Sequence, residues 1–396
     1  MMIRRRFVNI VVENYRSGMY SLHRLDVSKH LFYPSTAEAQ VLSAGPEALA
    51  NIGGRGDAPP VTDRLPELPA PCMSFNPSPT NNWNNPRLAF FGLVSPRCSE
   101  GKVLSFDGAG HALLYDADSH STIPMPTLGH PKGISPVVVS VPRPGAKEED
   151  LYIMHTAPAA AGLDSEYSFD VLRFGTPGQL RVVRTSPFQG WYWQSLPLPP
   201  FVYSPQYKPS LISSYTVVDG GRGICLSSAT EAIGTYCFDT VSGEWSHAGN
   251  WVLPFDGRVE YSPELKLWLG FSLDSHHHLC AMSGLSAMVN QPPVLHQVWQ
   301  DQMPKEWMAT RVSIVNLGAG RFCIAKVFKV APNTSAEEKA GYFSDWGVAD
   351  DDEFVVLTGL EIHCSHDDNN LLQWLQSFKH KSIRYMCTSN SIHCVL

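Results

Sequence analysis

The chain has 396 residues, of which 43% are hydrophobic and 17% are charged, so it holds enough apolar material for a large core. Its 30 lysines and arginines against 37 aspartates and glutamates give a net charge of -7, which excludes a global basic field for nucleic acid or an anionic membrane. Nine scattered cysteines without a C-x-x-C pair favour reduced thiols over a disulfide framework.

The N-terminal segment begins with a basic run, Arg4 to Arg6, and Glu13 interrupts the short apolar stretch that follows. A secretory signal needs a longer uninterrupted apolar segment, so secretion is not expected, and we expect the protein in the cytoplasm or the nucleus. No stretch approaches the roughly 20 apolar residues that span a bilayer. The basic run is interpreted as the solvated end of a strand, with a role in nuclear import as the alternative.

Alternating or β-branched runs recur along the whole chain, and Gly, Pro, Asn and Asp separate them. In chain order they are residues 7–13, 19–27, 111–117, 136–141, 150–154, 213–218, 235–240, 266–272, 321–328 and 353–362. Repeated helical segments are absent between them. This pattern predicts an all-β assembly of short antiparallel strands rather than a parallel α/β fold.

Three segments resemble one another and indicate a repeat. They read GMYSLHRLDVSKHLF (18–32), GHALLYDADSHSTI (110–123, ending at Ile123) and GTYCFDTVSGEW (234–245). Each joins an alternating strand to an Asp, a polar turn and a second strand that opens with a bulky residue. Asp239 and Trp245 are six residues apart, as are Asp26 and Phe32. We expect the Asp to close the turn by accepting backbone N–H groups and the bulky residue to hold one sheet against the next.

Sheets of this kind cannot cover both of their faces alone, so several must pack against one another. The sequence therefore predicts a single β-propeller-like domain over residues 1–396 with six or seven blades. The blades are assigned approximately to residues 7–36, 86–128, 136–202, 211–257, 258–301 and 311–364. The tail, residues 371–396, is expected to supply closing strands, in one arrangement by sharing a sheet with the first hairpin.

Two segments depart from the strand pattern. Residues 37–83 are rich in Pro and are predicted to be a loop or disordered insertion; the RGD at 55–57 within them is interpreted as a chance match. Residues 331–353 are predicted to be an acidic mobile loop. They hold a formal glycosylation acceptor at Asn333 and the run from Asp350 to Glu353, whose spacing does not fit an EF-hand calcium loop.

Several of the strand-rich segments resemble a known family. Residues 234–272, together with 5–26, 111–126, 191–205 and 321–328, are similar to a large plant family, expanded in grasses, of kelch-like and F-box-associated-like proteins. Their shared domain has no assigned function. The resemblance implies a β-propeller-like fold and carries no catalytic residue to transfer.

Three groups of residues that could form sites also have ordinary structural interpretations. His276, His277 and His278 are interpreted as a solvated hairpin turn, because consecutive strand residues alternate faces, with a metal site as the alternative. Trp191, Tyr192 and Trp193 are interpreted as packing between sheets, with a ligand platform as the alternative. Cys225, Cys237 and Cys323 lie in strand patterns and are read as small buried apolar residues.

Motifs for nucleophilic, zinc-peptidase, phosphate-binding and dinucleotide-binding chemistry are absent from the sequence. We therefore assign no catalytic, metal or cofactor-binding residue and no cofactor. The sequence favours a non-enzymatic scaffold or adaptor that binds a protein partner, with neither nucleic acid nor membrane as a ligand. The alternative is a propeller that binds a small molecule or glycan, or hydrolyses one, through a central pocket lined by carboxylates or histidines.

Overall fold

The computed structural model describes residues 4–43, 63–64, 67–78, 87–130, 132–133, 135–160, 169–176, 189–228, 233–273, 278–286, 292–301, 303–304, 307–330, 353–366, 372–387 and 390–396. The chain divides into two compact units: the first holds residues 1–5 and 76–298, and the second holds residues 6–75 and 299–396. Within the described ranges, no helix is long and apolar enough to cross a membrane.

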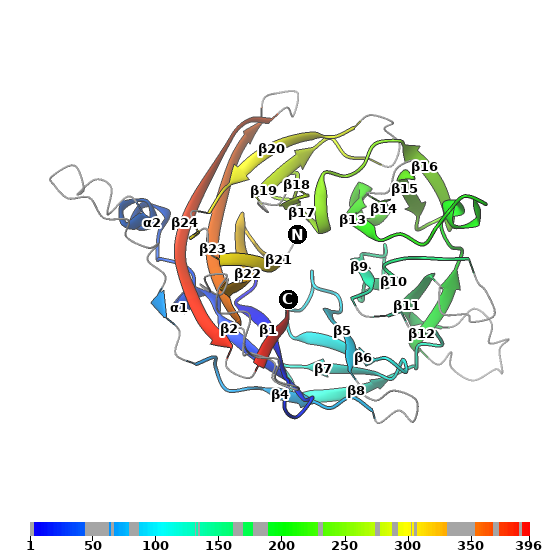
Figure 1. Ribbon diagram of the computed structural model, residues 1–396, viewed down its shortest axis with the longest axis horizontal. Coiled ribbons are helices and arrows are strands. Elements are labelled where there is room, and N and C mark those ends of the chain that lie inside the picture. Colours follow the sequence, from blue (N-terminus) through cyan, green and yellow to red (C-terminus); the bar gives the residue numbers. More distant parts are fainter. Residues whose placement is uncertain are drawn as a thin grey trace, which may run out of the picture. The chain divides into compact units, whose positions relative to one another are not determined.

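The first unit is built from meanders of four antiparallel strands that follow one another along the chain (Figure 1). The first two meanders comprise β5 (Leu88–Leu93), β6 (Lys102–Asp107), β7 (Ala112–Asp116) and β8 (Ser121–Met125), then β9 (Val137–Val141), β10 (Asp150–Met154), β11 (Phe169–Gly175) and β12 (Gly190–Leu196). The next two comprise β13 (Ile212–Val218), β14 (Gly223–Ser228), β15 (Gly234–Asp239) and β16 (Glu244–Gly249), then β17 (Phe255–Ser262), β18 (Leu267–Ser272), β19 (Leu279–Ser283) and β20 (Val294–Trp299).

The third and fourth meanders form one eight-stranded sheet, because β13 and β17 pair in parallel at Ser214↔Gly257 and Tyr215↔Arg258. Strand β17 begins at Phe255, close to the approximate boundary predicted between these two blades at 257/258. Two short 3-10 turns, η1 (Pro200–Tyr203) and η2 (Asp219–Gly221), flank β13. Apolar side chains from β9–β11 and β13–β15 share one core cluster, so neighbouring meanders cover each other's faces.

The second unit holds two sheets. One contains β21 (Trp307–Gly318), β22 (Arg321–Val330), β23 (Glu353–His366), β24 (Leu372–Cys387) and β3 (Asp63–Arg64), and the other contains β25 (Asn390–Val395), β1 (Phe7–Asn14), β2 (Tyr20–Asp26) and β4 (Met73–Phe75). Helices α1 (Val27–His30) and α2 (Thr36–Ser43) follow β2. The pairing of β1 with β25 confirms the prediction that the first hairpin shares a sheet with the C-terminal tail.

The predicted fold class, an all-β chain of β-propeller-like short antiparallel sheets, is confirmed by these meanders. The extent of the predicted single domain, 1–396, stays a prediction. Of the predicted insertion at 37–83, the described part includes α2, β3 and β4, whereas residues 44–62, with the RGD, lie outside the described residues. Of the predicted acidic loop, 331–352 lie outside them as well, and Glu353 begins strand β23 with only 6% of its surface exposed.

Two of the repeat's aspartates, Asp116 and Asp239, close turns as predicted, whereas Asp26 caps helix α1. Asp26 accepts a hydrogen bond from the backbone N–H of Ser28 (3.1 Å), Asp116 from that of Asp118 (3.0 Å) and Asp239 from those of Val241 (2.8 Å) and Ser242 (2.9 Å), which satisfies N–H groups that the turn leaves outside the ladder. These three aspartates therefore serve the scaffold.

The bulky residue six or seven positions later behaves differently in each copy. Trp245 donates its indole N–H to the Pro197 carbonyl (2.8 Å) and contacts the neighbouring meander, so its predicted packing role is confirmed. Phe32 is buried but follows helix α1 instead of opening a strand, because Asp26 caps that helix. Ile123 is 44% exposed, so the packing role expected for it is wrong.

Two glycines of the third copy have defined roles. Gly243 adopts a φ of +74° in the turn that Asp239 closes, a conformation that other residues rarely take. At Gly249, a Cβ atom would lie 2.4 Å from the indole nitrogen of Trp251, so only glycine admits this approach. Trp251 packs against the apolar cluster that β15, β17 and β18 share, as its predicted anchoring role requires.

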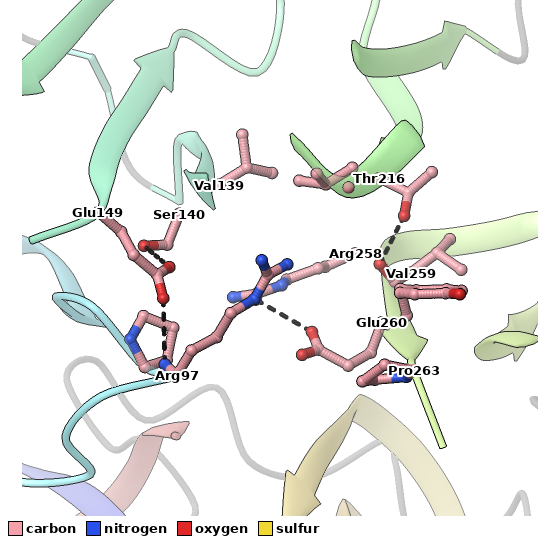
Figure 2. Close-up of a pocket in the computed structure, with 13 residues that line it drawn as sticks. Arg97, Val139, Ser140, Glu149, Thr216, Arg258, Val259, Glu260 and Pro263 are labelled. Carbon is pink, nitrogen blue, oxygen red and sulfur yellow. Dashed lines mark hydrogen bonds and ion pairs between the residues drawn. The ribbon is translucent and has the colours of Figure 1, made fainter. Parts of the chain in front are cut away.

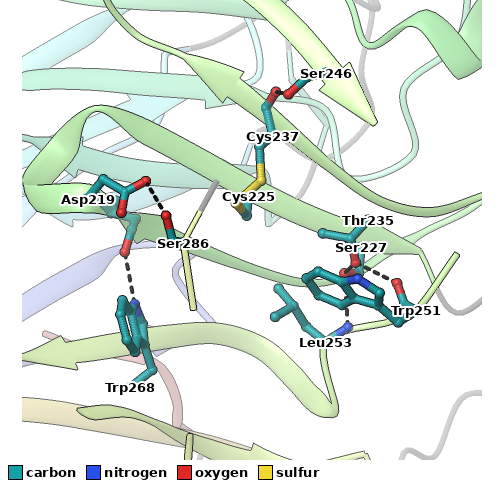
Figure 3. The surroundings of a disulfide bond; sticks show 11 residues. Asp219, Cys225, Ser227, Thr235, Cys237, Ser246, Trp251, Leu253, Trp268 and Ser286 are labelled. Carbon is teal, nitrogen blue, oxygen red and sulfur yellow. Dashed lines mark hydrogen bonds between the residues drawn. A yellow bond between two sulfur atoms is a disulfide. The ribbon is translucent and has the colours of Figure 1, made fainter. Parts of the chain in front are cut away.

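Cys225 of β14 and Cys237 of β15 face each other in register and form a disulfide (Figure 3). The expectation of reduced thiols is therefore wrong for this pair. The pairing could not be read from the sequence, since the two cysteines are 12 residues apart and only the strand register places them side by side. Both residues are buried, at 0% and 2% exposure, so the reading of these positions as part of the core is confirmed.

Removing this disulfide is expected to lower the free energy of unfolding by about 2 kcal/mol, because the bond restricts the unfolded chain. The double variant Cys225→Ala with Cys237→Ala should unfold at lower urea concentration than the wild type, as followed by circular dichroism. Cys98→Ala, at an exposed free cysteine, is the matched control and should leave the midpoint unchanged. An unchanged midpoint in the double variant would contradict the prediction.

Candidate functional site

The histidine and acidic candidates from the sequence do not form a site among the described residues. His276 and His277 lie outside those residues, as do Asp350, Asp351, Asp352 and Asn333. His278 exchanges hydrogen bonds with Ser272 across the end of the β18–β19 hairpin, as a turn residue does. Glu353 pairs with Arg311 (2.6 Å) inside the second unit instead of lying in a solvated loop. No group of three or more His, Cys, Asp or Glu side chains in the described ranges is placed to hold a metal.

The aromatic and thiol candidates are structural. Trp191 and Trp193 both pack against the core cluster shared by β5–β7 and β9–β11, which confirms packing between sheets. Burial raises the pKa of Cys323 to about 12, and that of Cys387 to about 12, so both thiols stay protonated at neutral pH and are poor nucleophiles.

A polar cavity of about 210 Å³ lies in the first unit, where its four meanders come together (Figure 2). Its lining comes from the segment after β5, from β9 and the residue before β10, from β13 and η2, and from β17. The charged and hydroxyl side chains in the lining are Arg97, Ser140, Glu149, Thr216, Arg258, Glu260 and Tyr261. We call this space the polar cavity. None of these residues was singled out in the sequence.

One wall of the polar cavity is organised around Glu149, which is only 4% exposed. Its carboxylate accepts hydrogen bonds from the Ser140 hydroxyl (2.8 Å) and from the backbone N–H of Arg97 (3.2 Å). The backbone N–H of Glu149 in turn donates to Ser95 Oγ (2.8 Å), and Ser95 is fully buried. These bonds tie the segment after β5 to β9 and β10, which fixes the position of Arg97 at the cavity.

The opposite wall is shaped by an irregularity in β17. Its register with β18 shifts between Asp256 and Glu260, and such bulges redirect side chains and bend the strand. The Val259 carbonyl accepts a hydrogen bond from the buried Thr216 hydroxyl (2.9 Å). Arg258 and Glu260 pair with each other at 3.0 Å on this wall. The Glu260 carboxylate raises the pKa of Arg258, so this guanidinium stays charged.

The two guanidinium groups reach from opposite walls toward the same part of the cavity (Figure 2). Arg97 is partly buried, and its guanidinium makes no hydrogen bond or ion pair with any described residue. Arg258 keeps 48% of its side chain accessible to water although its neighbours surround it, as expected of a group that faces an internal solvated space. The cavity therefore offers one positive charge that no nearby carboxylate neutralises directly.

A third arginine lies behind this wall. Arg5 is only 6% exposed, so the interpretation of a solvated strand end is wrong for this residue, and its Nε has no hydrogen-bond partner in the described part of the chain. Burial lowers the pKa of Arg5, whereas the carboxylates of Glu260, Glu100 and Glu149 favour its charged form. The lining itself carries two arginines and two glutamates, so Arg5 adds a further positive charge to this region.

A second, wider cavity of about 740 Å³ opens at the beginnings of β9, β13 and β17, whereas the polar cavity lies farther along the same strands. Its lining is mainly apolar and hydroxylic, with Val137, Leu211, Ile212 and Tyr215, and Asp256 is its charged member among the described residues. Burial raises the pKa of Tyr215, so its phenol remains neutral.

The lining of the polar cavity determines which groups it can offer to a ligand. Its described lining holds neither histidine nor cysteine, so Ser140 has no imidazole base beside it. The Glu149 carboxylate accepts hydrogen bonds from the Ser140 hydroxyl and the Arg97 backbone N–H, and the Glu260 carboxylate pairs with Arg258. Both carboxylates are therefore occupied by protein donors. The Ser140 and Thr216 hydroxyls donate to protein groups, so what the cavity presents to a ligand is guanidinium N–H groups and the Tyr261 hydroxyl, which bind anions.

The second unit holds a different charged cluster, which fixes the segment after β2. His380 is buried; its Nδ1 accepts the backbone N–H of Tyr33 (3.2 Å), and its Nε2–H donates to Glu361 (3.0 Å). Because a backbone N–H can only donate, this ring is neutral. Glu361 also accepts from Thr36 at the start of α2 (3.1 Å). This cluster is structural.

Stability of this cluster is expected to fall with acidity. Burial lowers the pKa of His380 below its usual 6.5, with Arg321 and Lys381 adding to the effect and Glu361 opposing it. As the pH falls, the histidine is therefore protonated in the unfolded state before it is protonated in the folded state. The contribution of neutral His380 to the free energy of unfolding is fully present above about pH 6.5. It is lost as the pH falls toward the folded-state pKa, by at most about 1.4 kcal/mol per pH unit. The stability difference between wild type and His380→Gln, measured by urea unfolding, should be smaller at low pH; a constant difference would contradict this.

Comparisons with known proteins give a family and several distant structures. A family model described as "Protein of unknown function (DUF1668)" matches residues 5–385. No curated protein matches the chain. Similar solved structures include the Cps50 (Swd1) β-propeller domain of Myceliophteria thermophila, with 9% identity and a TM-score of 0.37 over 95% of this chain and 88% of that one. A chain of a mitotic checkpoint complex has 9% identity and a TM-score of 0.35 over 94% and 78%.

A structural genomics protein of unknown function from Bacteroides thetaiotaomicron matches 61% of this chain with 9% identity and a TM-score of 0.36. The present chain spans 54% of the length of that protein. At such TM-scores these likenesses carry no argument about ligands or partners.

Proposed function

Since the chain belongs to the family described as "Protein of unknown function (DUF1668)", we propose a role from its own site: a non-enzymatic interaction scaffold that binds a protein partner at the polar cavity. The observation that carries this proposal is the Arg97 guanidinium, which reaches into the cavity without a partner among the described residues. Side chains with unused donors on a rigid sheet framework are typical of recognition sites.

The proposal includes the finer expectations from the sequence. The protein is placed in the cytoplasm or the nucleus, with a protein as its partner and neither nucleic acid nor membrane as its ligand. The resemblance to kelch-like and F-box-associated-like proteins of grasses supports an adaptor role. The absence of a paired nucleophile and base from the described lining of the polar cavity supports binding without catalysis.

Native affinity purification with the purified protein as bait tests this function. The wild type should recover one partner in near-equal amount, Arg97→Glu should lose it, and Arg16→Glu should retain it. Arg16 is the matched control because it is exposed and does not line the cavity. Circular dichroism establishes that both variants are folded. Failure to recover a stoichiometric partner, or a partner that Arg97→Glu still binds, would count against the function.

The wider cavity favours a second candidate function, binding of a small molecule or a glycan. Its volume of about 740 Å³ lies in the range of small-molecule sites, and Tyr215 and the hydroxyls beside it offer hydrogen bonds to sugar hydroxyls. Hydrolysis of a glycan would need a pair of carboxylates, whereas the described lining offers Asp256 alone. Calorimetric titration with neutral oligosaccharides tests this candidate; heats unaffected by Tyr215→Phe and Asp256→Asn would exclude the wider cavity.

A further inference from the structure

Building on the proposed function, we propose that the polar cavity recognises a single carboxylate group, which the Arg97 guanidinium binds with Arg258 beside it. A guanidinium presents its N–H donors as a planar fork that matches the two oxygens of a carboxylate. No described protein group accepts a hydrogen bond from the Arg97 guanidinium. Figure 2 shows this guanidinium opposite Arg258.

The charges around the cavity favour an anion with one charge over one with two. In the lining, Arg97 and Arg258 are matched by Glu149 and Glu260. Arg5 adds a positive charge behind the lining and Glu100 adds a negative one, so these groups balance one another. The Arg97 guanidinium has no direct partner among the described residues. A dianion such as a phosphate monoester would bring two negative charges to this one guanidinium, next to the carboxylates of Glu149 and Glu260, whereas one carboxylate matches its single charge.

The volume of the cavity fits the same group. A space of about 210 Å³ admits a short acidic side chain or a chain terminus, but it is smaller than the sites that enclose drug-sized ligands. The carboxylate can belong to a peptide of the partner, as an acidic side chain or a C-terminus, or to a small organic acid. Both sources share the chemistry that Arg97 recognises.

The test uses the full chain labelled with ¹⁵N at arginine Nε, titrated with defined probes at constant ionic strength. The probes are a blocked peptide with one Glu side chain, the same peptide with Gln, glutarate monoamide, glutaramide and inorganic phosphate. Assignment comes from the resonance that disappears in Arg97→Gln. The Glu peptide or the monoamide should shift the Arg97 resonance saturably, and the matched amides should not.

Variants then test the geometry. Arg97→Gln should weaken carboxylate binding at least tenfold, measured by calorimetry, and Arg97→Lys should weaken it less, because it keeps the charge and loses the fork. Arg16→Gln is the control and should bind as the wild type does. Binding of the peptide but not of the monoamide assigns the carboxylate to a protein partner, and the reverse assigns it to a small molecule.

Three results would overturn the inference: phosphate binding as tightly as the carboxylates, no saturable shift with either carboxylate, or full affinity in Arg97→Gln. The inference and the proposed function fail separately. Carboxylate binding without any partner that depends on the cavity would leave the inference standing and remove the scaffold role. A partner that needs Arg97 but binds through a segment without a carboxylate would leave the scaffold role standing and overturn the inference.

Discussion

Replacing Lys132 with Met is expected to lower the free energy of unfolding by about 3–5 kcal/mol, the usual loss when one member of a buried ion pair is removed. The Lys132 ammonium pairs with Asp170 of β11, and their side chains are 0% and 4% exposed. Asp170 also accepts a hydrogen bond from Ser195 of β12 at 2.6 Å. Met fills a similar volume but supplies no charge, so a buried carboxylate would face apolar atoms where the ammonium stood. Urea unfolding followed by circular dichroism measures the loss.

A double-mutant cycle separates the ion pair from the packing. Lys132→Met combined with Asp170→Leu removes both charges, and the double variant should be more stable than Lys132→Met alone, because no uncompensated charge stays buried. If the two single losses simply add, the two groups do not stabilise each other and the destabilisation comes from lost packing. Burial lowers the pKa of Lys132, and the Asp170 carboxylate raises it. The cost of burying the ammonium is thus offset by its attraction to Asp170.

The sequence predicted the sheets well because their signals are local. Strand alternation and turn residues mark each meander, and Asp116 and Asp239 close their turns in the structure as the repeat required. The long-range pairing of β1 with β25 was also within reach, since strands at both ends of a propeller-like array need partners for their edges.

The polar cavity was beyond prediction for a physical reason. Arg97, Glu149 and Arg258 are far apart in the chain, and none of them belongs to a sequence motif that indicates a binding site. Only the packing of four meanders and the register shift in β17 bring them together. The disulfide was missed for the same reason, because the pairing of Cys225 with Cys237 depends on strand register.

Replacing Trp245 with Ala is expected to lower the free energy of unfolding by about 3 kcal/mol, at the lower end for a large aromatic because the side chain is only partly buried. Its ring centre lies 5.1 Å from that of Phe238 in the neighbouring strand β15 and 5.6 Å from that of Phe169 in β11. The indole N–H also donates to the Pro197 carbonyl at 2.8 Å. One side chain thus joins the second meander to the third.

Two variants show which of these contacts matters. Trp245→Phe keeps an aromatic ring between Phe169 and Phe238 and loses the indole hydrogen bond, so its cost should be near 1 kcal/mol. Tyr203→Ala, at a tyrosine that is 63% exposed, should change stability by less than about 0.5 kcal/mol. If Trp245→Ala is as stable as the wild type but no longer retains a partner, the segment from Gly234 to Gly257 is a binding site. If the variant loses stability and its folded form still binds the partner, the segment serves to pack two sheets together.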